Sequence, residues 1–223
     1  MAEEVYTRRA LAQRPNRGDP LVKIVVYVEG GGRGNRKTLD DCRRGFGELF
    51  EKGVTDGDSP KVIACADRRS TFRDFRAGIE EGRDGFLILL VDSEDPVGPW
   101  VTSWAHLNNR DHWRQPAGTR DDQAHLMVQC MESWFLADRD ALTKYYGQGF
   151  LVNSLPRHPN IEQVPRQRLQ RTLRHATART QKGPYHKTRH GFELLTLINP
   201  ALVRQASVHA QSLFETLVAK ARS

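Results

Sequence analysis

Residues 21–32 read LVKIVVYVEGGG, a run of β-branched and aromatic residues that ends on an acid and three glycines. Such a run predicts a buried strand, and the glycines predict a turn directly after Glu29. Two further apolar runs follow, KVIACA at residues 61–66 and FLILLV at residues 86–91. Both are apolar at successive positions, which is typical of strands in a parallel sheet that is covered by helices on both faces.

Helical patterns separate these strands. Apolar residues recur every three or four positions over residues 38–52, where Asn35 or Thr38 can cap the helix, and a second helix is expected over residues 71–81. This alternation predicts a doubly wound, Rossmann-like α/β fold with a mostly parallel sheet. Further along, we expect a fourth strand over residues 124–131 and helices over residues 132–146, 165–178 and 191–198 and after Ser207.

The length of the chain, 223 residues, suits one domain with its own core. Residues 1–20 are polar and contain prolines and a glycine, which predicts a flexible arm. Residues 21–223 are expected to form a single domain, with an α/β core to about residue 146 and a helical portion from about residue 147. No apolar run approaches the roughly 20 residues that span a bilayer, so we expect no membrane partner and a cytoplasmic location.

Positive charge is concentrated in one segment. The net charge is +7, and residues 152–191 contain nine lysine and arginine residues against one acid, Glu162. Such a block suits a surface that binds the phosphate backbone of nucleic acid, and a solvated helix face is the alternative. The candidates for these contacts are Arg166, Arg168, Arg171, Arg174, Arg179 and Lys182.

Acidic residues follow two of the expected strands: Glu29 ends the first, and Asp92 and Glu94 follow the third. If these strands are neighbours, the three carboxylates converge at one edge of the sheet and need a cation. Oxygen ligands without histidine or cysteine select Mg²⁺ or Mn²⁺. Glu132, after the fourth expected strand, is a further candidate ligand, whereas Asp138 is expected to be structural. A phosphodiester could approach the metal over Gly30, Gly31 and Gly32, which lack side chains.

Four short motifs carry a resemblance. Glu29-Gly-Gly-Gly, Val91-Asp-Ser-Glu-Asp95, Met131-Glu-Ser-Trp-Phe-Leu-Ala-Asp138 and Tyr185-His-Lys187 together resemble a small bacterial family of TOPRIM-like proteins related to the RloB and OLD-type nucleases. The resemblance implies a TOPRIM fold and a nuclease that cleaves DNA or RNA with one or two metal ions. It also implies a role in phage defence beside an ABC-type ATPase. Glu94 stands where the wider superfamily has Asp, so either Glu94 or Asp95 would reach the metal.

Lys187 is a candidate catalytic residue because Gly183-Pro184 breaks the helical pattern before it. A turn there can bring the lysine close to the carboxylates, where it would stabilise charge on the scissile phosphate.

Other functions stay open. A noncatalytic binding or regulatory subunit of an ABC-type ATPase would keep the same fold. Residues 31–38 (GGRGNRKT) also approach the P-loop pattern of nucleotide-binding proteins, although Arg36 replaces its last glycine. The sequence leaves a homo-oligomer open as well.

Overall fold

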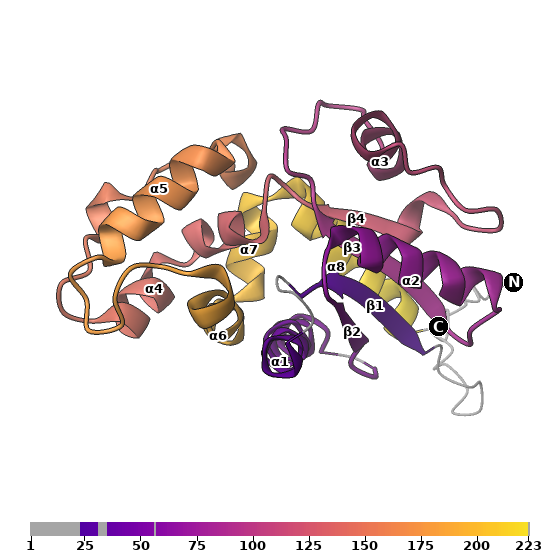
Figure 1. Cartoon of the computed structure of the whole chain (residues 1–223), viewed down its shortest axis with the longest axis horizontal. Coiled ribbons are helices and arrows are strands. Elements are labelled where there is room, and N and C mark those ends of the chain that lie inside the picture. The colour runs from indigo at the N-terminus through magenta and orange to yellow at the C-terminus, as the bar shows by residue number, and fades with distance from the viewer. Residues whose placement is uncertain (1–22, 31–34, 56, 223) are drawn as a thin grey trace, which may run out of the picture.

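A four-stranded, all-parallel sheet forms the centre of the computed structural model, which describes residues 23–30, 35–55 and 57–222 (Figure 1). The expected arm at residues 1–20 lies outside the described residues, as do Gly31 and Gly32. The strands are β1 (Ile24–Glu29), β2 (Lys61–Cys65), β3 (Phe86–Asp92) and β4 (Ala124–Met127), in the order β2-β1-β3-β4. The predicted α/β fold with a Rossmann-like parallel sheet is confirmed.

The chain reverses its direction across the sheet around β1. From β1 it passes through helix α1 (Arg36–Gly53) to β2 at the edge, and then through α2 (Arg68–Glu80) to β3 on the other side of β1. Strands β1 and β3 are therefore neighbours, with Val28 opposite Leu90. In open parallel sheets, ligands bind beyond the carboxyl ends of the strands at such a reversal.

Alternate residues of β1 belong to two separate cores. Val26 and Val28 pack into a core that includes Phe46 of α1 and Phe214 of α8 (Val208–Ala221). Tyr27 packs into a second core, together with residues of α2 and of α3 (Ser103–Asp111). Helices thus cover both faces, as the continuous apolar runs of the strands predict.

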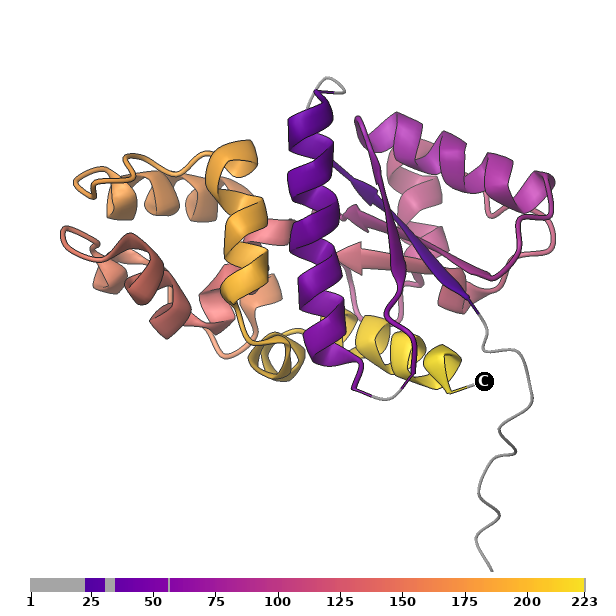
Figure 2. The same ribbon diagram turned by 90° about the horizontal axis from the view of Figure 1, so that it is seen from below.

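A helical portion follows β4 and lies beside the sheet, on the far side of α1 (Figures 1 and 2). Helix α6 packs closely on α1 at Gly45. A Cβ atom at that position would lie only 2.5 Å from the carbonyl oxygen of Phe192, so a larger residue would not fit. The elements of this portion are the 3₁₀ turns η2 (Met131–Ala137), η3 (Val152–Ser154) and η4 (Ile161–Gln163), the π turn η5 (Lys187–Gly191), and the helices α4 (Arg139–Tyr146), α5 (Arg166–Thr177), α6 (Phe192–Leu197) and α7 (Pro200–Ala206).

Several sequence-based boundaries were wrong. The helix expected over residues 132–146 is broken, because the Asp138 side chain caps α4 by accepting a hydrogen bond from the Ala141 N–H at 3.0 Å. Strand β4 ends at Met127, four residues earlier than expected. Helices α3 and α7 and the 3₁₀ turn η1 (Asp121–Gln123) were not predicted.

The three cysteines, Cys42, Cys65 and Cys130, are buried free thiols. Among the described residues, no helix combines the length and apolar character needed to cross a membrane.

Candidate active site

Two carboxylates lie at the carboxyl ends of the neighbouring strands β1 and β3. Glu29 is the last residue of β1 and Asp92 the last of β3. Burial raises the pKa of Glu29, and the nearby Asp92 carboxylate raises it further. The Oε2 atom of Glu29 is buried and has no hydrogen-bond partner among the described residues. The expected convergence of Glu29 with Asp92 is thus present.

Asp92 is held in a fixed position. Its side chain is 1% exposed and accepts hydrogen bonds from the Met131 backbone N–H at 2.7 Å and from Lys187 Nζ at 2.9 Å. The Arg68 guanidinium donates to the backbone carbonyl of Asp92. A buried carboxylate needs such donors, since an unpaired buried charge is costly.

Lys187 reaches the carboxylates from η5, as the turn after Gly183-Pro184 predicts. Burial by itself would lower the pKa of its ammonium group. The carboxylates of Asp92, Glu132 and Glu29 outweigh burial and raise this pKa above its ordinary value. Lys187 therefore stays charged at neutral pH and balances the negative charge around it.

Glu132, in η2, is the third carboxylate near Lys187. Its side chain is buried, and Tyr185 Oη donates to its Oε1 atom at 3.0 Å. The Oε2 atom of Glu132, like that of Glu29, is buried without a hydrogen-bond partner among the described residues. Two buried acceptor oxygens in this cluster thus lack a partner among the described residues.

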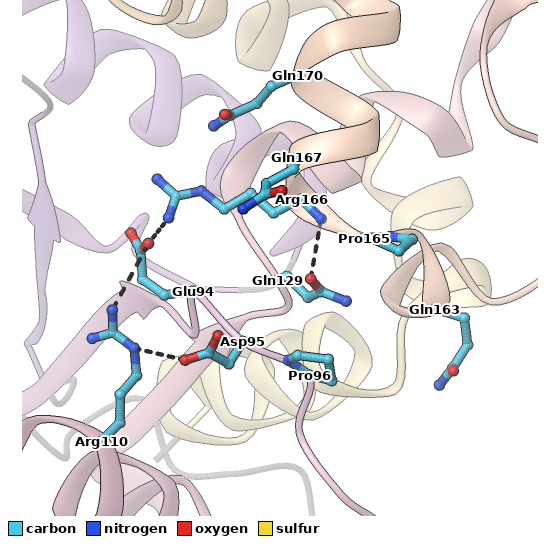
Figure 3. Close-up of a pocket in the computed structure, with 10 residues that line it drawn as sticks. All are labelled: Glu94, Asp95, Pro96, Arg110, Gln129, Gln163, Pro165, Arg166, Gln167 and Gln170. Atoms are coloured by element: carbon cyan, nitrogen blue, oxygen red, sulfur yellow. Dashed lines mark hydrogen bonds and ion pairs between the residues drawn. The ribbon is translucent and has the colours of Figure 1, made fainter.

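Glu94 and Asp95 form ion pairs with arginines of two other elements (Figure 3). Glu94 forms an ion pair with Arg166, at the start of α5, and lies 3.8 Å from Arg110 of α3. Asp95 accepts from Arg110 Nε at 3.2 Å and is 67% exposed. The structure therefore places neither side chain with Glu29 and Asp92, and their role as metal ligands stays a prediction.

Gly30 is required by packing. A Cβ atom there would lie 2.6 Å from the carbonyl oxygen of Cys65 and 2.7 Å from a methyl group of Leu39. The approach of a phosphodiester over Gly30 therefore stays a prediction, and Gly31 and Gly32 are not described.

The basic residues separate into two groups. Arg168, Arg171 and Arg174 are exposed on α5, and no ion pair joins them to a described carboxylate. Arg179 is exposed as well, whereas Lys182 Nζ lies 4.4 Å from the centre of the Tyr145 ring. Arg166 differs from these residues because it pairs with Glu94.

Two arginines at this edge, Arg68 and Arg110, were not predicted from the sequence. Arg68 binds both oxygens of Asp111, at 3.2 and 2.6 Å, in addition to the Asp92 carbonyl. Its position three residues after β2 was a usable signal, because β2 ends at the same edge as β1. Arg110 gave no such signal, because α3 was itself not predicted.

Among the residues that the structure describes, no three or more His, Cys, Asp and Glu side chains form a group that could hold a metal ion. No curated protein and no solved structure matches the chain. The family described as "Domain of unknown function (DUF4276)" matches residues 37–218, from the start of α1 into α8. The chain therefore belongs to the DUF4276 family.

Proposed function

We propose that the chain is a divalent-metal-dependent nuclease that cleaves phosphodiester bonds of DNA or RNA. One observation carries the proposal: Glu29, Asp92, Glu132 and Lys187 cluster at the edge of the parallel sheet where the strand order reverses, and two buried carboxylate oxygens there lack partners among the described residues. Perturbed pKa values and converging charges at such a place are typical of active sites.

The donor atoms fit Mg²⁺ or Mn²⁺. Glu29 and Asp92 would hold the ion, and both offer the oxygen ligands that these cations prefer. Protein sites for Mg²⁺ commonly use one or two carboxylates and leave the other positions to water and substrate phosphate, so a group of three protein ligands is not required. When bound, such an ion would activate water and offset charge on the phosphate.

The residues of the chain supply the remaining parts. The Met131 N–H and Lys187 hold the Asp92 carboxylate in one orientation. The Lys187 ammonium, protonated at neutral pH, would stabilise the negative charge that grows on the phosphate during cleavage. The exposed arginines of α5 would attract the nucleic-acid backbone.

The test combines Mn²⁺ titration calorimetry with cleavage of DNA and RNA. We expect Glu29→Gln and Asp92→Asn each to abolish Mn²⁺ binding and cleavage, because each removes a charged ligand. Glu51→Gln, on an exposed position of α1, is the matched control and should behave like the wild type. Wild-type Mn²⁺ affinity in both site variants would reject the proposal.

The same assays separate the enzyme from a docking subunit. A subunit that only binds an ABC-type ATPase would bind that partner in the presence of EDTA and would cleave neither nucleic acid with Mn²⁺. Because the defence role implies activation by the ATPase, cleavage should be measured with and without it.

A further inference from the structure

A hollow of about 650 Å³ lies next to the carboxylate cluster, between the chain after β3 and the start of α5 (Figure 3). Its volume falls within the roughly 300–1,000 Å³ of typical small-molecule sites. It is distinct from the carboxylate cluster, because none of Glu29, Asp92, Glu132 and Lys187 lines it. The lining residues used below are Glu94, Arg110, Gln163, Arg166, Gln167 and Gln170.

Two guanidinium groups meet at one end of the hollow, with the Glu94 carboxylate between them (Figure 3). Arg110 and Arg166 come from α3 and α5, and their side chains are 28% and 32% exposed. Glu94 occupies this place with a left-handed backbone, φ +68°. Such a conformation is uncommon for residues other than glycine, so surrounding contacts hold Glu94 there.

Three side-chain amides also line the hollow, those of Gln163, Gln167 and Gln170. None of these amide groups makes a hydrogen bond with another residue that the structure describes, although the Gln163 backbone N–H donates to the Asn160 carbonyl at 3.2 Å. Gln129 differs, because its amide accepts from the Arg166 N–H at 3.1 Å and donates to the Glu162 carbonyl at 3.2 Å. Three amides thus present donors and acceptors to the hollow beside two arginines.

We propose that this hollow binds one unpaired nucleotide of a nucleic-acid strand. Arginine forks fit the oxygens of a phosphate, and glutamine amides fit the Watson–Crick edge of a base. In a duplex that edge is already paired, so the base can reach the amides only from a single strand or after flipping. The inference rests on the proposed nuclease function and assigns single-stranded nucleic acid as its substrate.

Glu94 occupies the phosphate position in the free protein. Its carboxylate pairs with both arginines and competes with an incoming phosphate for them. Glu94, which lines the hollow, follows Asp92 by two residues, so the hollow adjoins the carboxylate cluster. A nucleotide bound here would place its neighbouring phosphodiester toward Glu29 and Asp92.

The first experiment measures binding of a fluorescent single-stranded 12-mer in EDTA, where cleavage is excluded. We expect Glu94→Gln to tighten binding severalfold and to steepen its dependence on salt, because two guanidinium groups are released. Glu80→Gln, which frees Arg76 on α2 from an ion pair of 3.3 Å, is the matched control and should change neither. Equal or weaker binding by a folded Glu94→Gln variant would overturn the proposal.

The second experiment removes the amides. The double variant Gln167→Ala/Gln170→Ala should bind the single strand about three- to tenfold more weakly, the effect of one or two lost hydrogen bonds, while Gln205→Ala on α7 should have no effect. A duplex of the same sequence should bind alike to all variants. Loss of duplex and single-strand binding to the same extent, or a free mononucleotide that binds as tightly as the strand, would overturn the assignment.

The two proposals can fail separately. If the protein cleaves with Mn²⁺ but the Glu94 and glutamine substitutions leave its single-strand affinity unchanged, the nucleotide site alone is rejected. A protein that binds single strands through these residues but never cleaves rejects the nuclease alone.

Discussion

Lys187 provides the positive charge beside the buried Asp92 carboxylate. Only two donors reach the Asp92 carboxylate among the described residues, the Met131 N–H and the Lys187 ammonium. Removing one partner of a buried ion pair commonly costs about 3–5 kcal/mol, because the other charge stays behind. The same lysine thus has a structural effect that must be separated from any effect on chemistry.

We expect Lys187→Met to lower the free energy of unfolding by about 3 kcal/mol in urea titrations without divalent ions. Added Mn²⁺ should restore part of this loss, because a cation would replace the missing positive charge beside Asp92 and Glu29. The double variant Asp92→Asn/Lys187→Met is the control and should be more stable than Lys187→Met alone, since it no longer buries an unpaired carboxylate. If Mn²⁺ stabilises Lys187→Met no more than it stabilises the double variant, the cation does not bind at Asp92.

A second prediction for Lys187 concerns rate. Single-turnover cleavage by Lys187→Met, measured at saturating substrate and below its melting temperature, should be one or two orders of magnitude slower than the wild type. The substrate affinity should change little, because the lysine would act on charge that develops only in the transition state. An unchanged rate with slightly weaker binding would make Lys187 one more basic contact and remove it from the catalytic residues.

At the scale of elements, Glu162 joins η4 to the start of α8. Its buried carboxylate accepts hydrogen bonds from the Ser207 hydroxyl at 2.5 Å and from the His209 N–H at 3.0 Å, and it contacts the His209 ring at 3.0 Å. Burial alone would raise the pKa of Glu162, but these donors outweigh burial and lower it below its ordinary value. The charged form is therefore the one that the fold stabilises.

The lowered pKa of Glu162 predicts how its contribution to the free energy of unfolding depends on pH. A carboxyl group with a lowered pKa in the folded state stabilises the fold above its unfolded pKa, and this stabilisation is lost as the pH falls through the folded value. We expect Glu162→Gln to cost about 2 kcal/mol at pH 7 and much less near pH 3. Urea unfolding at both pH values measures the difference, with Glu51→Gln as the exposed control. An equal cost at both pH values would assign the effect to packing.

The positions of the strands and the proximity of Glu29 and Asp92 at their ends were predicted well from the sequence. Three apolar runs gave β1, β2 and β3 to within a few residues, because burial on both faces leaves a continuous signal. The proximity of Glu29 to Asp92 followed from strand order, and that of Lys187 from the turn at Gly183-Pro184. The strand predictions succeeded because their pattern is local, whereas the two contacts depended on β1 and β3 being neighbours and on the turn folding back toward the sheet edge.

Other contacts between distant elements were not predictable. The ion pair of Glu94 with Arg166, which lies 72 positions later, was not expected, and the role of Glu94 as a metal ligand stays a prediction. Helix α3 has only a weak amphipathic pattern, and burial of Trp104 and Leu107 against the sheet stabilises it instead. The break at Asp138 depends on its bond to the Asn199 N–H at 2.9 Å, a tertiary contact.

At the scale of the whole molecule, helix α5 lies far from helix α2 (Figure 1). Changing Arg168, Arg171 and Arg174 together to Glu should weaken nucleic-acid binding and flatten its salt dependence, by about 0.9 in slope per lost phosphate contact on duplex DNA. The matched control reverses three exposed arginines of α2, Arg69, Arg73 and Arg76. If the salt dependence of nucleic-acid binding is unchanged in the α5 variant, these arginines do not contact phosphates, and that face is solvated surface or a contact for a protein partner.

Helix α8 covers the sheet face that β1 and β3 begin to form much earlier in the chain. Phe214 of α8 packs edge-on against Phe50 of α1, with ring centres 6.1 Å apart, in the same core as Val26 and Ile88. During translation all four strands therefore leave the ribosome before the helix that shields them. Part of the apolar face of the nascent sheet stays uncovered for that interval, so the speed at which residues 128–221 are synthesised sets how long a chaperone or an aggregating neighbour can reach it.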